Sequence, residues 1–311
     1  MTAGYRIFLL VVEEMSISRA AQKAYVTQQC VSDHIRRLEE EFGVKLFERK
    51  PRLTLTPAGE AVYRTVQQVK ILEDGMRKNL DEIRTDVRGY FSVGLNATRA
   101  RILLPNVLPK FHTLLPQVRV SAILAETLSL QDQLLKGEID LFVGVNVGQN
   151  PLFRIQPLAM EEVFLLIGRE LATTHFTDTP QTADWTKNGV DLRDFVHVPF
   201  VRNLRESTTT TLLNRHCDAL NLTLNTLYSV SDYDIQIDLC GMNLAAAFCP
   251  AMPLEQVRRH NETASERERI AVFPIKGLTE KLRVDLVTHQ NGLNPQYIET
   301  FIELVRDYCA G

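Results

Sequence analysis

The sequence predicts an N-terminal all-α winged helix-turn-helix with a long linker helix, followed by an α/β domain made of two Rossmann-like subdomains. Three observations predict this fold. Two short helical patterns meet at a tight turn near the N-terminus, and one apolar stripe then continues for about eight helical turns. Strand and helix patterns alternate from there onward, which is typical of α/β domains. A length of 311 residues suffices for two cores.

Three short helices are expected at the N-terminus. The first covers residues 5–14 and turns its apolar residues to a core. Ser18 is a candidate N-cap for a second helix over residues 19–25. Thr27 lies in the tight turn that follows and can cap a third helix, Gln28–Phe42. The order of these elements predicts a helix-turn-helix.

The third expected helix has two chemically different faces. The face opposite to its apolar residues carries Gln, Ser and Arg side chains, which can hydrogen-bond base edges in a DNA major groove. Residues 18–37 carry four Lys or Arg against one Asp, a balance that suits a phosphate backbone. A solvated polar helix face is the alternative that periodicity alone leaves open. The apolar residues repeat every three or four positions and are expected to face the core: Val31, Ile35, Leu38 and Phe42.

A small β wing and a long helix are expected next. Short β-like stretches at residues 45–49 and 52–54 flank Lys50-Pro51, and the basic tip of this wing is placed to contact phosphates or the minor groove. Pro57 then begins a helix that runs to about residue 87. Its apolar stripe has no partner helix nearby in sequence, so we expect it to pair with a second copy of the chain. The alternative is that it packs on its own C-terminal domain.

The alternating patterns after residue 89 predict parallel strands joined by right-handed crossovers, in two units with a cleft between them. The predicted strands are 90–95, 118–124, 141–145, 163–167, 196–201, 224–230, 244–248, 270–274 and 282–288, and the predicted helices are 101–115, 128–136, 207–220, 233–240 and 295–308. The predicted domains are 1–59, 60–88 and 89–311, with subdomain I at about 89–165 and 270–311 and subdomain II at about 166–269.

The loops that follow these strands are candidates for a ligand site. In open α/β sheets, ligands bind beyond the carboxyl ends of the strands, at helix N-termini. Amide, hydroxyl and guanidinium donors in these loops favour an anionic small molecule, a carboxylate. The alternative is that the arginines form surface pairs and that the hydroxyl groups only cap helices. The candidate ligand-binding residues are Asn96, Thr98, Arg99, Thr127, Asn203, Arg205 and Asp232.

The composition and the motifs of the chain argue against several other classes of protein. The formal net charge of −3 does not itself indicate a nucleic-acid partner. No apolar run approaches the roughly 18 residues of a membrane span. The N-terminus reads as an amphipathic helix rather than a signal peptide, so a cytoplasmic location is expected. No metal-ligand spacing, GxGxxG or Walker loop occurs, so we expect no catalytic site, metal or cofactor.

The five cysteines are scattered and contain no CxxC motif. Neither a disulfide framework nor a zinc site is implied, and buried free thiols are expected. A redox pair of Cys240 and Cys249 is the alternative, because two thiols could respond to oxidation in an accessible, electropositive setting.

Five short motifs occur in order at the spacing of a known family. The stretch from Gly89 onward also resembles the effector-binding domain of that family, which has a periplasmic-binding-protein-like fold. The family often has Pro and Ala where this chain has Gln29 and Cys30, so an operator sequence does not transfer from a relative. The motifs are Ser18-Arg19-Ala20-Ala21, Thr27-Gln28-Gln29-Cys30-Val31-Ser32, Ile35-Arg36-Arg37-Leu38-Glu39, Gly43-Val44-Lys45-Leu46-Phe47-Glu48-Arg49 and Leu55-Thr56-Pro57-Ala58-Gly59. Together they resemble the winged helix-turn-helix of LysR-type transcriptional regulators.

This resemblance implies a sequence-specific DNA-binding transcriptional regulator that is controlled by a small-molecule effector bound between the two subdomains. The implied partners are a double-stranded, pseudo-palindromic DNA operator, an anionic effector such as a carboxylate, and further copies of the chain. The linker helix would form a homodimer, and dimers would pair into a homotetramer. An alternative from another class is a solute-binding module with a vestigial helix-turn-helix. The expected DNA-binding residues are Arg19, Gln28, Gln29, Ser32, Arg36, Arg49 and Arg52.

Overall fold

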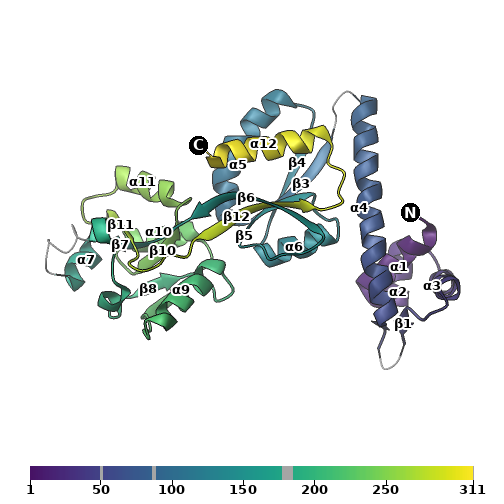
Figure 1. The fold of residues 1–311 in the computed structure, drawn as a ribbon, viewed down its shortest axis with the longest axis horizontal. Coiled ribbons are helices and arrows are strands. Elements are labelled where there is room, and N and C mark those ends of the chain that lie inside the picture. The colour runs from purple at the N-terminus through teal and green to yellow at the C-terminus, as the bar shows by residue number, and fades with distance from the viewer. Residues whose placement is uncertain (50–51, 86–88, 177–184, 311) are drawn as a thin grey trace.

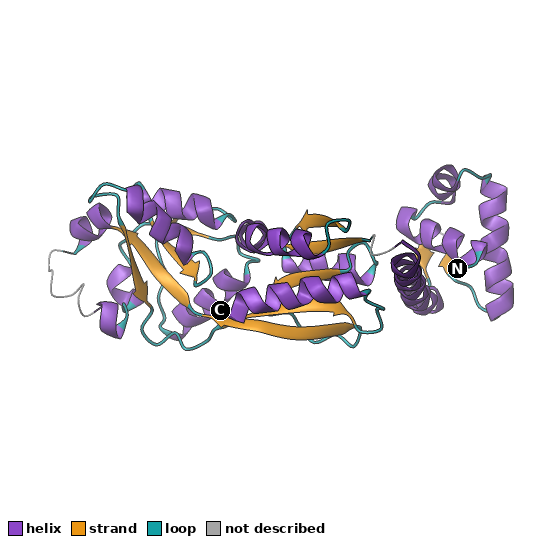
Figure 2. Cartoon of the chain, turned by 90° about the horizontal axis from the view of Figure 1, so that it is seen from above, coloured by secondary structure: helices purple, strands orange, loops and turns teal. Residues whose placement is uncertain are grey.

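The computed structural model describes residues 1–49, 52–85, 89–176 and 185–310. Three parts follow one another along the long axis of the molecule in Figure 1: an N-terminal helical unit, the long helix α4 (Pro57–Thr85) and an α/β domain. Figure 2 shows the α/β domain from above as two sheet-containing subdomains placed end to end. The predicted fold class is confirmed.

The N-terminal unit packs three helices around a small apolar core. These helices are α1 (Ala3–Glu14), α2 (Ile17–Ala24) and α3 (Gln28–Phe42). Phe8 from α1 and Val31 from α3 are fully buried in this core. The sequence prediction of a helix-turn-helix therefore holds at the level of its elements.

Two details of this unit differ from the sequence prediction. Ser16 caps α2 in place of Ser18, because its hydroxyl accepts a hydrogen bond from the backbone N–H of Arg19 at 3.3 Å. Ser18 therefore lies inside the first turn. Phe42 was expected in the core but is 38% exposed, since it is the last residue of α3 and the last buried residues of that helix are Leu38 and Glu39.

The wing is a short antiparallel ribbon of β1 (Phe47–Glu48) and β2 (Thr54–Leu55). Of the expected basic tip, Arg49, Lys50 and Arg52, only Lys50 lies outside the described residues. Glu39 of α3 anchors the base of the wing, because its buried carboxylate accepts hydrogen bonds from the backbone N–H groups of Leu46 and Phe47 at 2.9 and 3.4 Å. One carboxylate therefore holds α3 and the wing together.

Helix α4 packs along one side against the α/β domain. Gly75 allows a close approach there, since a Cβ at this position would lie 2.9 Å from the carbonyl oxygen of Leu293. Lys78 forms an ion pair with Asp140 of the same domain. These contacts use Gly75 and Lys78, whereas the alternative from the sequence had the apolar stripe itself packing on this domain; its members Leu72, Met76, Leu80 and Ile83 stay exposed.

Another side of α4 leaves apolar residues uncovered. They recur every three or four positions and so form a stripe along the helix. The stripe, called the α4 stripe below, consists of Leu72 (39% exposed), Met76 (47%), Leu80 (51%) and Ile83 (80%).

Subdomain I contains a mixed sheet with the strand order β4-β3-β5-β12-β6. Strand β3 pairs in parallel with β4 and β5, as expected, whereas β12 pairs antiparallel with both β5 and β6. Helices α5 and α12 cover one face of the sheet and α6 covers the other. The bounds are β3 (Tyr90–Leu95), α5 (Ala97–Leu114), β4 (Arg119–Leu124), α6 (Thr127–Leu135), β5 (Leu141–Val145), β6 (Phe153–Glu161), β12 (Leu282–His289) and α12 (Gln296–Ala310).

Subdomain II contains a second mixed sheet with the order β11-β7-β10-β8-β9. Strands β10, β8 and β9 are parallel neighbours, and β7 pairs antiparallel with β10 and β11. Helices α7 and α9 pack on one face and α10 and α11 on the other. The bounds are β7 (Val163–Gly168), α7 (Arg169–His175), η1 (Leu192–Phe195), β8 (Phe200–Arg202), α9 (Thr208–Ala219), β9 (Thr226–Ser229), α10 (Tyr233–Gly241), β10 (Ala246–Pro250), α11 (Leu254–Thr263) and β11 (Ile270–Pro274).

The structure corrects the prediction at five elements. Strand β11 was placed with subdomain I but pairs with β7 and so belongs to subdomain II, as does the start of β7 at Val163. Strand β6 was not expected, because Pro157 and polar residues interrupt its pattern; an edge strand tolerates proline, and β6 is an edge. Helices α7 and α11 were also missed.

Candidate nucleic-acid interface and ligand cleft

The polar face of α3 presents most of the expected DNA-binding side chains. Gln28 and Gln29 are exposed in the first turn, and Ser32 is half-buried one turn later. Thr27 begins the helix, because its hydroxyl accepts a hydrogen bond from the backbone N–H of Cys30 at 3.2 Å. The helix therefore starts where the two glutamines become accessible to a groove.

Arg36 lies on the same face and is held by acidic neighbours on its own helix. Its guanidinium is 60% exposed and lies 3.1 Å from Asp33 and 4.0 Å from Glu40. Exposed pairs of this kind contribute at most about 1 kcal/mol, so a base or phosphate can replace them. Asp33, the single acidic residue among residues 18–37, is thus a local partner of Arg36.

The other expected arginines have different surroundings. Arg19 lies 3.2 Å from Glu14 and also donates to the carbonyl oxygen of that residue, so it ties α2 to the end of α1. Lys23 joins this cluster, and its ammonium group lowers the pKa of the Glu14 carboxyl. Arg49 and Arg52 of the wing are both exposed, and residues 50–51 between them lie outside the described residues.

The expected ligand residues converge on a cavity of about 90 Å³ between the two subdomains. The N-termini of α5, α6, α9 and α10 all reach it. Side-chain groups cap α5 and α10, whereas neither Glu126 before α6 nor Ser207 before α9 makes such a cap. Backbone N–H groups at the start of α6 and α9 are therefore available to a ligand. The cavity is lined by Asn96, Ala97, Thr98, Arg99, Glu126, Thr127, Val145, Asn203, Ser207, Thr208, Thr209, Ser231, Asp232, Tyr233, Pro250 and Leu282.

Helix α5 begins earlier than the sequence predicted, and this shift places two site residues. Asn96 is the N-cap, with its side-chain oxygen accepting from the backbone N–H of Arg99 at 2.9 Å. Thr98 and Arg99 consequently lie in the first turn of α5, beside the cavity. The prediction began the helix only at residue 101.

The two terminal nitrogens of Arg99 are engaged by the protein, whereas its buried Nε has no hydrogen-bond partner among the described residues. Its two terminal nitrogens donate to the two oxygens of Glu161 at 3.0 and 2.9 Å, and both side chains are 6% exposed. Such a bidentate, desolvated pair fixes the orientation of the guanidinium. The expected role of Arg99 as a free donor to a ligand is therefore limited by Glu161.

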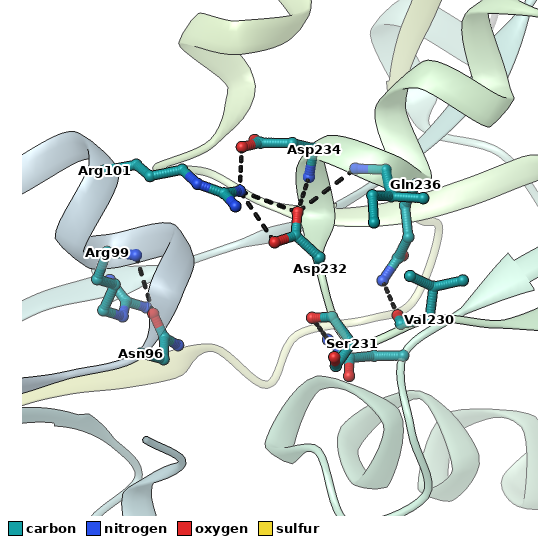
Figure 3. A network of polar contacts seen from close by, with 10 residues as sticks. Asn96, Arg99, Arg101, Val230, Ser231, Asp232, Asp234 and Gln236 are labelled. Carbon is teal, nitrogen blue, oxygen red and sulfur yellow. Dashed lines mark hydrogen bonds and ion pairs between the residues drawn. The ribbon is translucent and has the colours of Figure 1, made fainter. Parts of the chain in front are cut away.

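Arg101 does not itself line the cavity but reaches from α5 to the N-terminus of α10 (Figure 3). One terminal nitrogen lies 3.0 and 2.9 Å from the two oxygens of Asp232 and also contacts Asp234. Burial raises the pKa of the Asp232 carboxyl, but the hydrogen bonds from Arg101 and from the backbone N–H of Asp234 outweigh burial and lower it overall.

Arg205 is the one expected ligand residue that does not line the cavity; it is exposed on the loop before α9. The sequence prediction passed over several residues that do. Tyr233 donates to the hydroxyl of Thr209 at 2.7 Å, and burial raises the pKa of this tyrosine to about 12. Thr210 and Thr211 tie the loop to α9 by donating to the carbonyl oxygens of Asn203 and Ser207, each at 3.1 Å. Four consecutive threonines at residues 208–211, which are unusual at the start of a helix, were the sequence signal for this part of the lining.

Other site types find little support in the described ranges. Among those residues, no group of three His, Cys, Asp or Glu side chains is arranged to hold a metal ion, and no helix has the length and apolarity needed to cross a membrane. The redox alternative is disfavoured, because both thiols are buried, and burial raises the pKa of Cys240 to about 12 and also raises that of Cys249.

Comparisons with known proteins identify both parts of the chain. Residues 3–60 match the model of bacterial regulatory helix-turn-helix proteins of the lysR family, and residues 84–310 match the LysR substrate binding domain. Among curated relatives, an uncharacterized HTH-type transcriptional regulator, YfiE, from Escherichia coli is 31% identical over 169 residues, covering 54% of this chain and 57% of that protein. CysB from Haemophilus influenzae is 29% identical over 136 residues, covering 43% and 42%. The matches thus span about half the length of these relatives.

Solved structures share the fold across nearly the whole chain. A full-length OxyR variant from Pseudomonas aeruginosa has a TM-score of 0.68 at 22% identity and covers 98% of this chain and 95% of its own. CbnR, described as a LysR family transcriptional regulator, has a TM-score of 0.57 at 20% identity, with 98% of each chain covered. At these identities the likeness concerns the fold alone. The two family matches together cover most of the sequence, and the chain therefore belongs to the LysR family.

Proposed function

We propose that this protein is a sequence-specific transcriptional regulator that binds double-stranded DNA through α3 and responds to a small molecule in the cleft between its subdomains. The observation that carries the proposal is the exposed, polar N-terminal half of α3, set on a packed three-helix core and followed by a wing. DNA is intracellular, so this function agrees with the expected cytoplasmic location.

In the proposed complex, α3 lies in the major groove. Gln28 and Gln29 can bond adenine, Arg36 can bond guanine after leaving Asp33, and Ser32 can bond either base. Arg49 and Arg52 of the wing contact phosphates or the adjacent minor groove. Arg19 contributes positive charge near the backbone while remaining tied to Glu14.

A homodimer through the α4 stripe would supply two reading helices for a pseudo-palindromic operator. The stripe is apolar, exposed and helical in spacing, and a second α4 offers the matching surface. Pairing of two such dimers would give the homotetramer that the sequence predicts.

The proposed effector is a small anion such as a carboxylate. Its charge would be met by the uncapped N-termini of α6 and α9, since Arg99 and Arg101 are already paired with acidic residues. Hydroxyl groups of Ser207, Thr208 and Ser231 and the amide of Asn203 are within the lining. The small cavity favours a compact ligand.

A binding titration tests the regulatory function. The purified chain is titrated against the DNA upstream of its own gene and of the neighbouring divergent gene, at low and high salt, with and without competitor DNA. We expect a footprinted site that survives competitor and weakens steeply with salt. Absence of DNA binding even at low salt would instead favour the solute-binding module with a vestigial helix-turn-helix.

A further inference from the structure

An ion-pair cluster connects the two subdomains beside the ligand cavity (Figure 3). Arg101 belongs to α5 of subdomain I, whereas Asp232 and Asp234 belong to the N-terminal end of α10 in subdomain II. The pairing residues are separated by more than 130 positions in sequence, as Arg101 and Asp234 differ by 133. The cluster therefore links two bodies that have separate cores.

Asp232 has two roles that place the cluster at the cavity. It lines the cavity, and it also caps α10 by accepting hydrogen bonds from the backbone N–H groups of Asp234 at 2.9 Å and Ile235 at 3.4 Å. A separation of α5 from α10, which both border the cavity, would therefore have to stretch or break the contact between Arg101 and Asp232.

We propose that Arg101, Asp232 and Asp234 form an ionic clamp that holds the effector cleft closed and must release before a ligand enters. The proposal rests on the assignment of this cavity as the effector site. In the clamped arrangement the cavity has a volume of only about 90 Å³.

The strength of the clamp suits a reversible closure. Arg101 is 48% exposed and Asp234 is 32% exposed, so water competes with the pairs and salt screens them. The buried Arg99–Glu161 pair, two residues away on the same helix, lies within subdomain I and stays closed during such a motion. Arg99 therefore fixes α5, while Arg101 regulates the opening.

Hydrogen–deuterium exchange on the full chain, without any ligand, tests the clamp. Arg101→Gln removes the cation, and Asp234→Asn weakens the pair while leaving the Asp232 cap in place. Arg258→Gln is the matched control, because Arg258 is an exposed arginine that pairs with Glu255 and Glu262 on a single helix, α11. Exchange is measured at residues 127–130 and 208–211, the starts of α6 and α9. Thr127, Thr208 and Thr209 of these segments line the cavity, whereas Arg101 pairs with Asp232 and Asp234 of α10 and its cap.

We expect exchange at these two segments to become about two- to fivefold faster in Arg101→Gln and Asp234→Asn, and to stay unchanged in Arg258→Gln. Raising the salt to about 1 M should accelerate exchange in the parent chain and not in Arg101→Gln. Faster exchange confined to residues 97–101 and 232–236 would mean local fraying and would overturn the clamp. Equal exchange in all variants would also overturn it. Neither outcome depends on DNA or effector binding.

Discussion

The two candidate sites use arginine in opposite ways. On α3, Arg36 pairs only with residues three and four positions away on its own helix, and its guanidinium is 60% exposed. In the cleft, Arg99 and Arg101 pair with carboxylates far away in sequence. The first arrangement leaves a preformed surface for a large charged partner, whereas the second uses the charges to hold the protein together.

This difference explains why the same residue type carries different information in the two sites. Arginine on an exposed helix face is free to change partner at little cost, so its presence there predicts recognition. Arginine at a desolvated position must be paired with an acidic residue before any ligand arrives, so its presence there indicates a structural role. The predictions below test this contrast, from the largest expected effect to the smallest.

The largest effect is expected for Glu161→Ala. This change leaves the buried guanidinium of Arg99 without a counter-charge and should lower the free energy of unfolding by about 3–5 kcal/mol. Glu162→Ala is the control, because Glu162 is 55% exposed and pairs with Lys281 at the surface; it should cost less than about 1 kcal/mol. Urea unfolding followed by circular dichroism measures both. The double variant Arg99→Met/Glu161→Leu should recover most of the loss, and equal effects of the two single changes would contradict a buried charge pair.

A smaller effect is expected at Glu39, the buried carboxylate under the wing. Burial raises the pKa of this carboxyl, but hydrogen bonds from Lys45, Leu46 and Phe47 outweigh burial and lower it. Glu39→Gln should cost about 1–3 kcal/mol at pH 7, because a neutral amide replaces the charged acceptor of two buried backbone N–H groups.

The lowered pKa of Glu39 also predicts a pH dependence. A carboxyl whose pKa falls on folding stabilises the protein above its unfolded value of about 4.3, and this contribution is lost as pH falls through the folded value. The parent chain should therefore lose more stability than Glu39→Gln between pH 7 and pH 3 in thermal unfolding. Glu40→Gln, at an exposed neighbouring position, serves as the control. Parallel pH profiles for the parent chain and Glu39→Gln would show that the ionised Glu39 carboxylate does not stabilise the contact between α3 and the wing.

The contrast between the sites also accounts for what the sequence could predict. Helix α3 was predicted with its bounds because its signals are local: a threonine cap, a four-three-four apolar spacing and a glycine in the left-handed conformation (φ 67°) after its last residue. The cleft loops were located from strand order, and Asn96, Thr98, Arg99, Thr127, Asn203 and Asp232 all line the cavity. Their partners were not predicted, because Glu161 lies on an edge strand with no clear pattern and pairs across 62 positions.

For Arg36→Ala we expect a loss of DNA-binding free energy as large as the loss of stability in Glu39→Gln, but no loss of stability. If Arg36 leaves Asp33 to bond a guanine, its removal should weaken specific binding by about 1–3 kcal/mol and relax the preference at one base pair. Competition titrations with single-base operator variants measure this effect. Arg37→Ala is the matched control, since Arg37 is exposed on α3 but is turned away from the reading face by one residue. Unchanged affinity and preference would remove Arg36 from the reading face.

The smallest effect is expected for Arg52→Ala in the wing. A phosphate contact carries no base information, so this change should weaken binding to specific and scrambled duplexes alike and reduce the slope of log affinity against log salt by about one. Titrations at several salt concentrations measure the slope, with Lys110→Ala on α5 as a control for total charge. A loss confined to the specific duplex would show that Arg52 reads bases. The wing would then recognise the base sequence as α3 does. Exposure on the wing would in that case no longer separate arginines that contact phosphates from arginines that read bases.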